Sequence, residues 1–223
     1  MTAARDDILS TIRRSLGVTG GEAPRLAAVR ERLAGAPRGI IPARGQLDAA
    51  GRIALFRAEA ESVQATTAEV APGEIASEIA RWLRDNNLPA TLRMGADPRL
   101  AALDWSATTL AISHGASEGD DLNGVSHAFG GVAETGTLVL VSGPDNPTTL
   151  NFLPDNHIVV IDSKDIAGDP ESVWTRLRER YGKGLMPRAV NMITGPSRSG
   201  DIEQKLLLGA HGPRRLHIVV IHD

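Results

Sequence analysis

The sequence contains no cysteine among its 223 residues. This absence excludes disulfide bonds, a thiolate nucleophile, and zinc or iron–sulfur sites held by cysteine alone. If the chain takes part in redox metabolism, it does so without a conventional iron–sulfur cluster of its own, and we expect no cofactor in it. The six histidines form no His-Glu-x-x-His pattern and the carboxylates form no calcium-binding loop, so we also expect no metal site.

Aromatic residues are scarce, at 3% of the chain, and the formal net charge is only -3. Proteins that bind nucleic acids use basic patches and stacking rings, so these values argue against a nucleic-acid partner. No apolar run approaches the length of a membrane span. The charged residues Arg5, Asp6 and Asp7 interrupt the N-terminal segment, which is unlike a secretory signal. We therefore expect a cytoplasmic protein.

Residues 1–45 are predicted to form an N-terminal helical arm. Apolar residues recur at helical spacing up to Leu16, where Gly17 can end the helix, and again over 26–33. Prolines and glycines then break the pattern before residue 45. We favour an arm that packs as a flap on its own domain, and the alternative is a docking or dimerisation element.

Residues 46–223 alternate between helical and strand-like patterns. Helices are predicted over Leu47–Glu61, from Pro72 onward, and over Asp169–Tyr181. Short apolar runs, each bounded by Gly, Pro, Asp or Asn, are predicted as buried strands: Ala90–Met94, Thr108–Ile112, Thr137–Val141, His157–Ile161, Ala189–Ile193 and Leu216–Ile221. This alternation indicates an α/β domain with a mainly parallel sheet flanked by helices.

The segment Ser113–Gly136 is predicted to be a long, polar, glycine-rich loop, which in a compact domain is often functional. Glu134 lies where this loop enters the next strand, and a desolvated carboxylate there could act as a nucleophile or general base. The candidate ligand-binding residues beside it are Gly130, Gly131, Thr135 and Gly136. The structural alternative is that Glu134 caps a turn or pairs with an arginine.

A second candidate loop, Thr194–Asp201, follows the strand predicted at Ala189–Ile193. Open α/β sheets usually bind ligands at the carboxyl ends of their strands. Backbone N–H groups and the side chains of this loop could hold a phosphate or carboxylate, and its candidate residues are Gly195, Ser197, Arg198 and Asp201. The alternative is an N-capping turn for a helix that begins in 202–208.

A third loop, Gly209–Arg215, places His211 between glycines. An accessible imidazole there could titrate near neutral pH, although a tight turn with solvated charges fits the same pattern. We predict that Glu134 and Arg198 line one pocket at the carboxyl ends of the strands, with His211 as a proton partner. The alternative is a buried ion pair between Glu134 and Arg198 that joins two loops.

The same loops carry a family resemblance. Residues 133–140, 153–154 and 157–158 resemble the central signature of the lactate-utilization (LUD) domain. Residues 193–198, 201–203, 208–213 and 216–217 resemble its C-terminal signature, with matching order and spacing. The short arm and the lack of cysteine resemble the lactate-utilization protein C branch, whereas B-type relatives add ferredoxin-like cysteine motifs.

The resemblance implies a NagB/RpiA/CoA-transferase-like fold for residues 46–223. It also implies a role in the oxidation of L-lactate to pyruvate, beside iron–sulfur partner subunits. Because the chain lacks cysteine, we expect a non-redox component of that system, which binds a small anionic ligand or a partner subunit. The alternatives are a free-standing sugar-phosphate isomerase or acyl-CoA transferase, and a purely structural assembly factor. CoA transferases of this fold use a glutamate near a glycine, and Glu134-Thr135-Gly136 looks similar, which is an analogy of fold alone.

Overall fold

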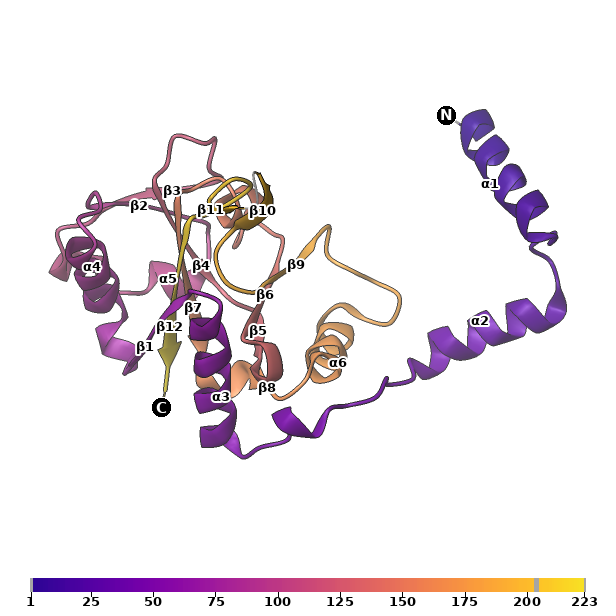
Figure 1. The fold of residues 1–223 in the computed structure, drawn as a ribbon, viewed down its shortest axis with the longest axis horizontal. Helices are drawn as coiled ribbons and strands as arrows, with labels where there is room; N and C mark the ends of the chain where they lie inside the picture. Colours follow the sequence, from indigo (N-terminus) through magenta and orange to yellow (C-terminus); the bar gives the residue numbers. More distant parts are fainter. Residues whose placement is uncertain (1, 203–204, 223) are drawn as a thin grey trace.

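The computed structural model describes residues 2–202 and 205–222, with the backbone alone for residues 2, 3, 200–202, 205 and 206 (Figure 1). The helices are α1 (Thr2–Leu16), α2 (Ala23–Gly35), α3 (Ala49–Ser62), α4 (Ile75–Asp85), α5 (Pro98–Ala101) and α6 (Pro170–Tyr181). The strands are β1 (Thr66–Val70), β2 (Thr91–Met94), β3 (Ala111–His114), β4 (Asn123–His127), β5 (Gly130–Val132), β6 (Thr137–Val141), β7 (Asn156–Asp162), β8 (Ile166–Ala167), β9 (Val190–Ile193), β10 (Arg198–Ile202), β11 (Lys205–Leu208) and β12 (Arg215–Ile221).

The main sheet has six strands in the order β1-β12-β7-β4-β2-β3, and every pairing in it is parallel. Its central strands are buried on both faces, which explains their unbroken apolar sequence. In β7, Ile158 and Val160 pack on one side with α4 and α5. Val159 and Ile161 pack on the other side with α3 and β6. The prediction of an α/β fold with a mainly parallel sheet flanked by helices is confirmed.

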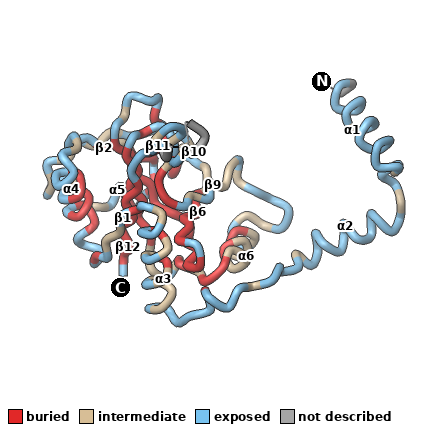
Figure 2. The backbone as a smooth tube through the Cα atoms, viewed as in Figure 1, coloured by how far each residue is buried: buried red, intermediate tan, exposed pale blue. Residues whose placement is uncertain are grey.

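A second, mixed sheet of four strands covers one face of the main sheet, in the order β8-β5-β6-β9. β6 is antiparallel to both β5 and β9, while β5 and β8 are parallel. Helix α6 packs on the outer side of this sheet, where Val173 contacts Val132 and Val139. Figure 2 shows the buried backbone concentrated in these layers.

The segment predicted as one long loop, Ser113–Gly136, contains β4, β5 and a 3-10 turn, so that prediction is wrong. β4 carries Asn and Gly, which favour loops, yet every residue in it is buried. The amide of Asn123 explains how the strand tolerates them, because its Nδ2 donates to Pro89 O and to Thr91 O, each at 2.9 Å. A buried polar side chain that bonds to the neighbouring backbone has no signature in apolar periodicity.

Two other elements differ from the sequence prediction. Residues 202–208 were expected to begin a helix, but β10 and β11 form an antiparallel hairpin there, and no described residue in it is helical. The strand expected at Thr108–Ile112 starts later, at Ala111, because Thr108 ends a 3-10 turn and donates through Oγ1 to Trp105 O at 2.7 Å. Both errors involve elements of five residues or fewer, in which a periodic pattern is too short to be decisive.

The arm formed by α1 and α2 extends away from the two sheets (Figure 1). Helix α2 has no buried residue, and Ile12 and Leu33 remain exposed. Among the described residues, hydrogen bonds between the arm and the domain begin at the last turn of α2, where Lys183 Nζ donates to Ala34 O at 2.6 Å, and continue after it, where Gly39 N donates to a Glu171 carboxylate oxygen at 3.1 Å. The interpretation of the arm as a packed flap is therefore wrong, while a domain boundary at residue 45 stays a prediction. Among the described residues, no helix is long and apolar enough to cross a membrane.

Candidate functional site

A cavity of about 270 Å³ lies where the end of β9 meets the beginnings of β7 and β12, and we name it the amino-edge cavity. It is lined by Asn151, Phe152, His157, Met192, Ile193, Gly195, Pro196, Ser197, Arg198, His211, Gly212, Pro213 and Leu216. Four of the residues predicted from sequence, Gly195, Ser197, Arg198 and His211, lie in this lining.

Ser197 holds together the two loops that were predicted separately. Its backbone N–H donates to Pro213 O at 2.8 Å, and its carbonyl oxygen accepts from Gly209 N at 2.9 Å. Its hydroxyl oxygen accepts from His211 N at 3.2 Å. These three bonds hold the backbone of the His211 loop beside the loop that carries Arg198, so the two loops form one wall of the cavity.

The floor of the cavity carries two polar side chains that sequence reasoning missed, Asn151 and His157, each 1% exposed. The hydroxyl of Ser126 donates to Asn151 Oδ1 at 3.3 Å, so it accepts from His157 Nε2, which lies 3.1 Å away. His157 Nδ1 and Asn151 Nδ2 have no hydrogen-bond partner. Burial lowers the pKa of His157 to about 3, so its ring is neutral at pH 7. The floor therefore offers one free acceptor and one free donor.

The rim of this cavity combines charge with apolar surface. Arg198 and His211 are exposed, and so are Phe152 and Met192. A guanidinium can bind a carboxylate or phosphate through two hydrogen bonds, while the apolar side chains suit a short hydrocarbon part. The backbone of Asp201 lies in β10, but its side chain is outside the described residues.

Glu134 does not line this cavity, so the prediction that Glu134 and Arg198 share a pocket is wrong. Glu134 is 6% exposed, in the 3-10 turn Ala133–Thr135, and its backbone N donates to Gly168 O at 3.3 Å. Burial, and then the nearby carboxylate of Asp169, raise its pKa, while Arg44 opposes them. Its Oε2 atom has no hydrogen-bond partner.

The expected edge of the sheet was also wrong. Arg198 follows β9, but β9 belongs to the mixed sheet and runs antiparallel to β6. Its end therefore lies next to Pro213, just before the amino end of β12. A strand's place in sequence could not reveal this, because the rule for carboxyl ends applies only within one parallel sheet.

The glycines near Glu134 have packing neighbours. Gly136 has φ +62°, and a Cβ there would lie 2.4 Å from Ala60 N in α3. A Cβ on Gly130 would lie 2.2 Å from an Arg176 guanidinium nitrogen. On Gly131 it would lie 2.9 Å from a methyl carbon of the core. At all three positions the space that a side chain would occupy is filled by other atoms of the protein, so the absence of a side chain is explained by packing.

Thr135 belongs to a short chain of hydroxyl groups that joins the two regions. Thr135 Oγ1 and Thr137 Oγ1 are 2.7 Å apart, and Thr137 Oγ1 is 2.7 Å from Thr194 Oγ1. Thr194 directly precedes Gly195 in the cavity wall. The turn that carries Glu134 is thus connected to the cavity through two hydrogen bonds without opening into it.

A family model for the LUD domain matches residues 122–221. Lactate utilization protein C from Geobacillus sp. (strain WCH70) is 40% identical over 93 residues, which cover 41% of this chain and 39% of that protein. Lactate utilization protein C from Exiguobacterium sp. (strain ATCC BAA-1283 / AT1b) is 36% identical over 101 residues, 45% of this chain and 44% of that protein.

The solved structures include a DUF162 family protein from Deinococcus radiodurans, with a TM-score of 0.61 and 19% identity. The match covers 78% of this chain and 99% of that one, and at this identity it shows the fold alone. The chain spans about two fifths of the length of the curated relatives it matches. The matched segment includes β4, β7, β12 and every residue that lines the amino-edge cavity. Residues 122–221 of this chain are therefore similar to the LUD domain.

Proposed function

We propose that this chain is a non-redox component of a lactate-utilization system and that its amino-edge cavity binds a small carboxylate. The similarity to proteins named lactate utilization protein C supports the metabolic context. The observation that carries the binding proposal is the pairing of Arg198 on the rim with two unpartnered buried atoms, His157 Nδ1 and Asn151 Nδ2, on the floor.

The proposed binding mode follows from the donors and acceptors present. Arg198 binds the carboxylate, Asn151 Nδ2 donates to an oxygen of the ligand, and His157 Nδ1 accepts from a hydroxyl group. Buried polar atoms of this kind cost about 1–3 kcal/mol when they remain unpaired, so a ligand that satisfies them gains affinity. The apolar rim accommodates a methyl or methylene group.

Electron transfer is assigned to other subunits in this proposal. The chain contains no cysteine, and cysteine thiolates are the usual ligands of iron–sulfur clusters. We propose iron–sulfur proteins as its partners. Affinity purification from cells grown on L-lactate is expected to recover them, and recovery of the tagged chain alone in repeated preparations would count against this part.

A deletion strain without a second route of lactate oxidation tests the role. It is expected to grow on glucose but poorly on L-lactate, and the wild-type gene restores growth. Arg198→Ala is expected to fail to restore growth. Arg84→Ala, which removes an exposed arginine on α4 outside the cavity, is the matched control and restores it. Full complementation by Arg198→Ala would overturn the proposed site.

A free-standing isomerase or acyl-CoA transferase is the alternative, and one observation favours it. Glu134 combines burial, a raised pKa and an unpartnered oxygen, which are features of catalytic carboxylates. Glu134→Gln separates the two functions. It leaves growth on L-lactate intact if Glu134 has only a structural role, and abolishes growth if that carboxylate acts as nucleophile or base.

A further inference from the structure

A second cavity, of about 240 Å³, lies at the opposite edge of the main sheet, and we name it the carboxyl-edge cavity. β4 ends there at His127, β7 ends at Asp162, and Asp97 follows β2. This is the edge at which open parallel sheets usually bind ligands. Its lining residues are Asp97, Arg99, His127, Phe129, Val141, Ser142, Gly143, Pro144, Asp145, Asn146, Arg180 and Tyr181, and none of them lines the amino-edge cavity.

His127 presents a free lone pair in this cavity. Its Nδ1 lies 3.0 Å from Ala128 O, and a carbonyl oxygen only accepts, so Nδ1 carries the proton. Burial, and then Arg99, lower the pKa of His127, which keeps the ring neutral at pH 7. Its Nε2 atom then faces Asp162 Oδ2 at 3.5 Å. Two acceptors face each other across this gap, and a donor from a third molecule would satisfy both.

Asn146 presents a second free acceptor. It is 5% exposed, its Nδ2 donates to Val141 O at 3.4 Å, and its Oδ1 has no partner. The loop that carries it is held rigidly, because Ala96 N donates to Pro144 O at 3.0 Å. A Cβ on Gly95 would lie 2.1 Å from the carbonyl oxygen of the same loop, so the two segments are in direct contact. The acceptor is therefore positioned before any ligand arrives.

The two arginines of the cavity differ in what they can bind. Arg99 is neutralised by Asp97, with Nη2 at 2.7 Å from Oδ2 and Nε at 3.1 Å from Oδ1. Arg180 lies over the rings of Phe129 and Tyr181, 5.7 and 5.6 Å from their centroids. Among the described residues Arg180 has no carboxylate partner, which leaves its guanidinium able to bind an anion.

We infer that the carboxyl-edge cavity binds a small anion with two hydroxyl groups. One hydroxyl donates into the gap between His127 Nε2 and Asp162 Oδ2, the second donates to Asn146 Oδ1, and the anionic group binds Arg180. The volume is below the range of drug-sized pockets, which starts at about 300 Å³, so the ligand has few heavy atoms. This second site does not rest on the proposed function of the amino-edge cavity.

Three acids that share a three-carbon skeleton test the inference by calorimetric titration of the full chain carrying Arg198→Ala, which removes the proposed carboxylate contact of the amino-edge cavity. Glycerate carries two hydroxyl groups, L-lactate one and propanoate none. Each lost hydroxyl leaves a buried acceptor unpaired, so affinity is expected to fall by about tenfold at each step. Equal affinity for glycerate and propanoate, or no binding of glycerate, would overturn the inference.

Titrations with glycerol and glycerol 3-phosphate test whether the site requires an anionic group on the ligand and whether a phosphate can replace the carboxylate. Glycerol lacks the charge and is expected to bind at least about tenfold more weakly than glycerate, as expected for the loss of a charge-assisted contact. Tighter binding of glycerol 3-phosphate than of glycerate supports the same site and assigns a phosphate to Arg180. Equal binding of glycerol and glycerate contradicts the role of Arg180.

Titration of arginine variants shows which cavity binds glycerate. Arg180→Ala is expected to weaken glycerate by about tenfold or more while leaving glycerol unchanged. Arg178→Ala, on the same helix but outside the cavity lining, is the matched control and leaves both unchanged. All these titrations use the Arg198→Ala background, and glycerate binding that is seen in the wild-type protein but is absent from Arg198→Ala would assign the ligand to the amino-edge cavity instead.

A spectroscopic readout keeps the test independent of folding effects. The imidazole signal of His127, assigned by its loss in His127→Gln, is expected to shift on addition of glycerate to the wild-type protein and to stay unchanged with propanoate. A shift of equal size with both acids, or a shift of the His211 signal alone, would contradict a hydroxyl contact at His127.

Discussion

Glu134, His157 and His217 are buried ionisable side chains whose pKa values shift in the direction that keeps each group neutral. Burial raises the pKa of Glu134 and lowers the pKa of His157 to about 3 and of His217 to about 4. The consequences for stability have opposite signs with respect to pH. The histidines destabilise the fold when the pH falls, and the carboxyl group destabilises it when the pH rises.

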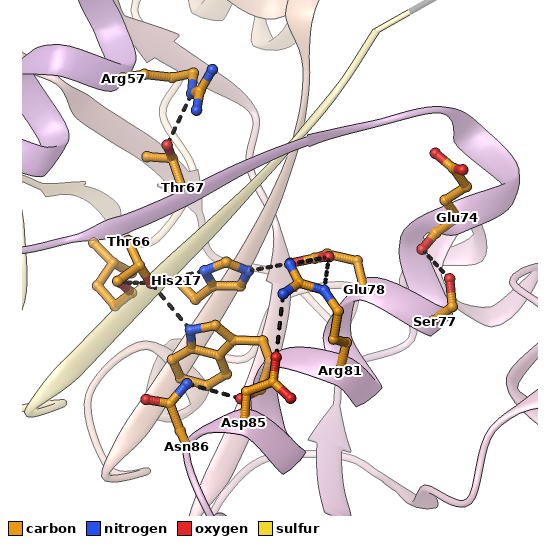
Figure 3. A network of polar contacts seen from close by, with 12 residues as sticks. Arg57, Thr66, Thr67, Glu74, Ser77, Glu78, Arg81, Asp85, Asn86 and His217 are labelled. Atoms are coloured by element: carbon orange, nitrogen blue, oxygen red, sulfur yellow. Dashed lines mark hydrogen bonds and ion pairs between the residues drawn. The ribbon is translucent and has the colours of Figure 1, made fainter.

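His217 makes the acid side of this dependence testable (Figure 3). Trp82 Nε1 donates to Thr66 Oγ1 at 3.2 Å, and Thr66 Oγ1 lies 2.8 Å from His217 Nδ1. The imidazole stacks on Trp82 with ring centroids 4.8 Å apart, and its Nε2 is 3.4 Å from Glu78 Oε1. The ring is thus held as a neutral group whose protonation in the folded state is costly.

Stability is expected to fall between pH 6.5 and about 4, because the unfolded chain takes up a proton at His217 in this window and the folded chain does not. The slope from one such histidine is about 1.4 kcal/mol per pH unit. Urea unfolding at pH 7, 6 and 5 measures it. His217→Gln is expected to reduce the slope, and His222→Gln, at an exposed site, is the control that leaves it unchanged. Equal slopes in the wild type and His217→Gln would contradict this assignment.

The pH dependence of stability that arises from Glu134 has the opposite sign to that from His217. Its folded pKa is raised, so its contribution to stability is full below its unfolded value near 4.5 and is lost as the pH rises through the folded value. Glu134→Gln removes the titration. We expect the variant to gain stability relative to the wild type as the pH rises from 4.5 to 7, measured by urea unfolding. A variant that is less stable than the wild type at pH 7 would mean that Arg44 and Glu134 form a stabilising ion pair.

At the scale of elements, two turns that contain glycine pack closely against the C-terminal end of helix α3. Gly136, at φ +62°, approaches Ala60 N, and Gly195, at φ +74°, approaches Val63 O. A Cβ at either position would lie well inside van der Waals contact with helix backbone, at 2.4 and 2.6 Å. These contacts fix the turn of Glu134 and the wall of the amino-edge cavity to the same helix.

Gly136→Ala is therefore expected to cost at least about 2 kcal/mol, since it combines a positive φ with overpacking against backbone. Gly182→Ala is the control. Gly182 also has a positive φ, of +91°, but its nearest neighbour is a Leu185 side-chain carbon at 3.5 Å, so the loss should be about 1 kcal/mol. Thermal unfolding measures both, and similar losses in the two variants would show that the contact with α3 contributes nothing.

Sequence patterns predicted the strands that contain a continuous run of apolar residues. β6, β7 and β12 are such strands, because both faces of each are covered. β4 was missed because its buried face includes amide, hydroxyl and imidazole groups that are satisfied only by neighbours distant in sequence. The hairpin of β10 and β11 belongs to neither larger sheet, so its strands do not show the apolar pattern of a strand that is covered on both faces.

Some residues of the candidate site could likewise be predicted from sequence, and others could not. Loop residues such as Ser197, Arg198 and His211 could be predicted, because glycine and polar clusters after a strand are visible in sequence. His157 stood inside an apolar run and Asn151 in a short turn, so their meeting at the floor needed the three-dimensional pairing of β4 with β7. The separation of Glu134 from Arg198 likewise depends on strand direction, which local patterns do not encode.

At the scale of the whole molecule, the main sheet places one cavity at each of its edges. The amino-edge cavity is lined by residues of β7, β9 and β12, and the carboxyl-edge cavity by the last residues of β4 and β6, with Asp162 of β7 beside His127. β7 therefore connects His157, near its beginning, with Asp162, at its end. Because a parallel sheet is rigid, variants at one edge should leave the other edge unaffected, which is why the two proposals can be tested separately.

The composition of the whole chain also predicts its behaviour after purification. With no cysteine to ligate an iron–sulfur cluster, the protein is expected to be colourless and to show no lactate dehydrogenase activity by itself. The measurement is a visible absorption spectrum together with lactate-dependent dye reduction by the isolated chain. Dye reduction at rates typical of enzymes would contradict the assignment of electron transfer to partner subunits.

The arm can be removed to test what it contributes to the fold. Helix α2 buries no residue, so deletion of residues 1–37 is expected to change the melting temperature by less than about 2 °C, on the scale of roughly 2–4 °C per kcal/mol for a chain of this size. The deletion retains the bond from Arg38 Nη2 to Ser172 Oγ, 3.2 Å long, and the bond from Gly39 to Glu171.

Deletion of residues 1–47 serves as the contrasting variant, because it also removes the segment that packs on the domain. A Cβ on Gly45 would lie 2.0 Å from Gly168 O, and Gln46 Nε2 donates to Asp169 Oδ2 at 3.0 Å. Asp169 caps α6 by accepting from Ser172 N at 2.9 Å, so loss of its neighbours should loosen that helix. We expect the longer deletion to lower the melting temperature by several degrees more than the shorter one, about 1–2 kcal/mol of stability. Equal melting temperatures would place the start of the domain after residue 47, and a large loss in the shorter deletion would mean that the arm packs on a protein surface in solution.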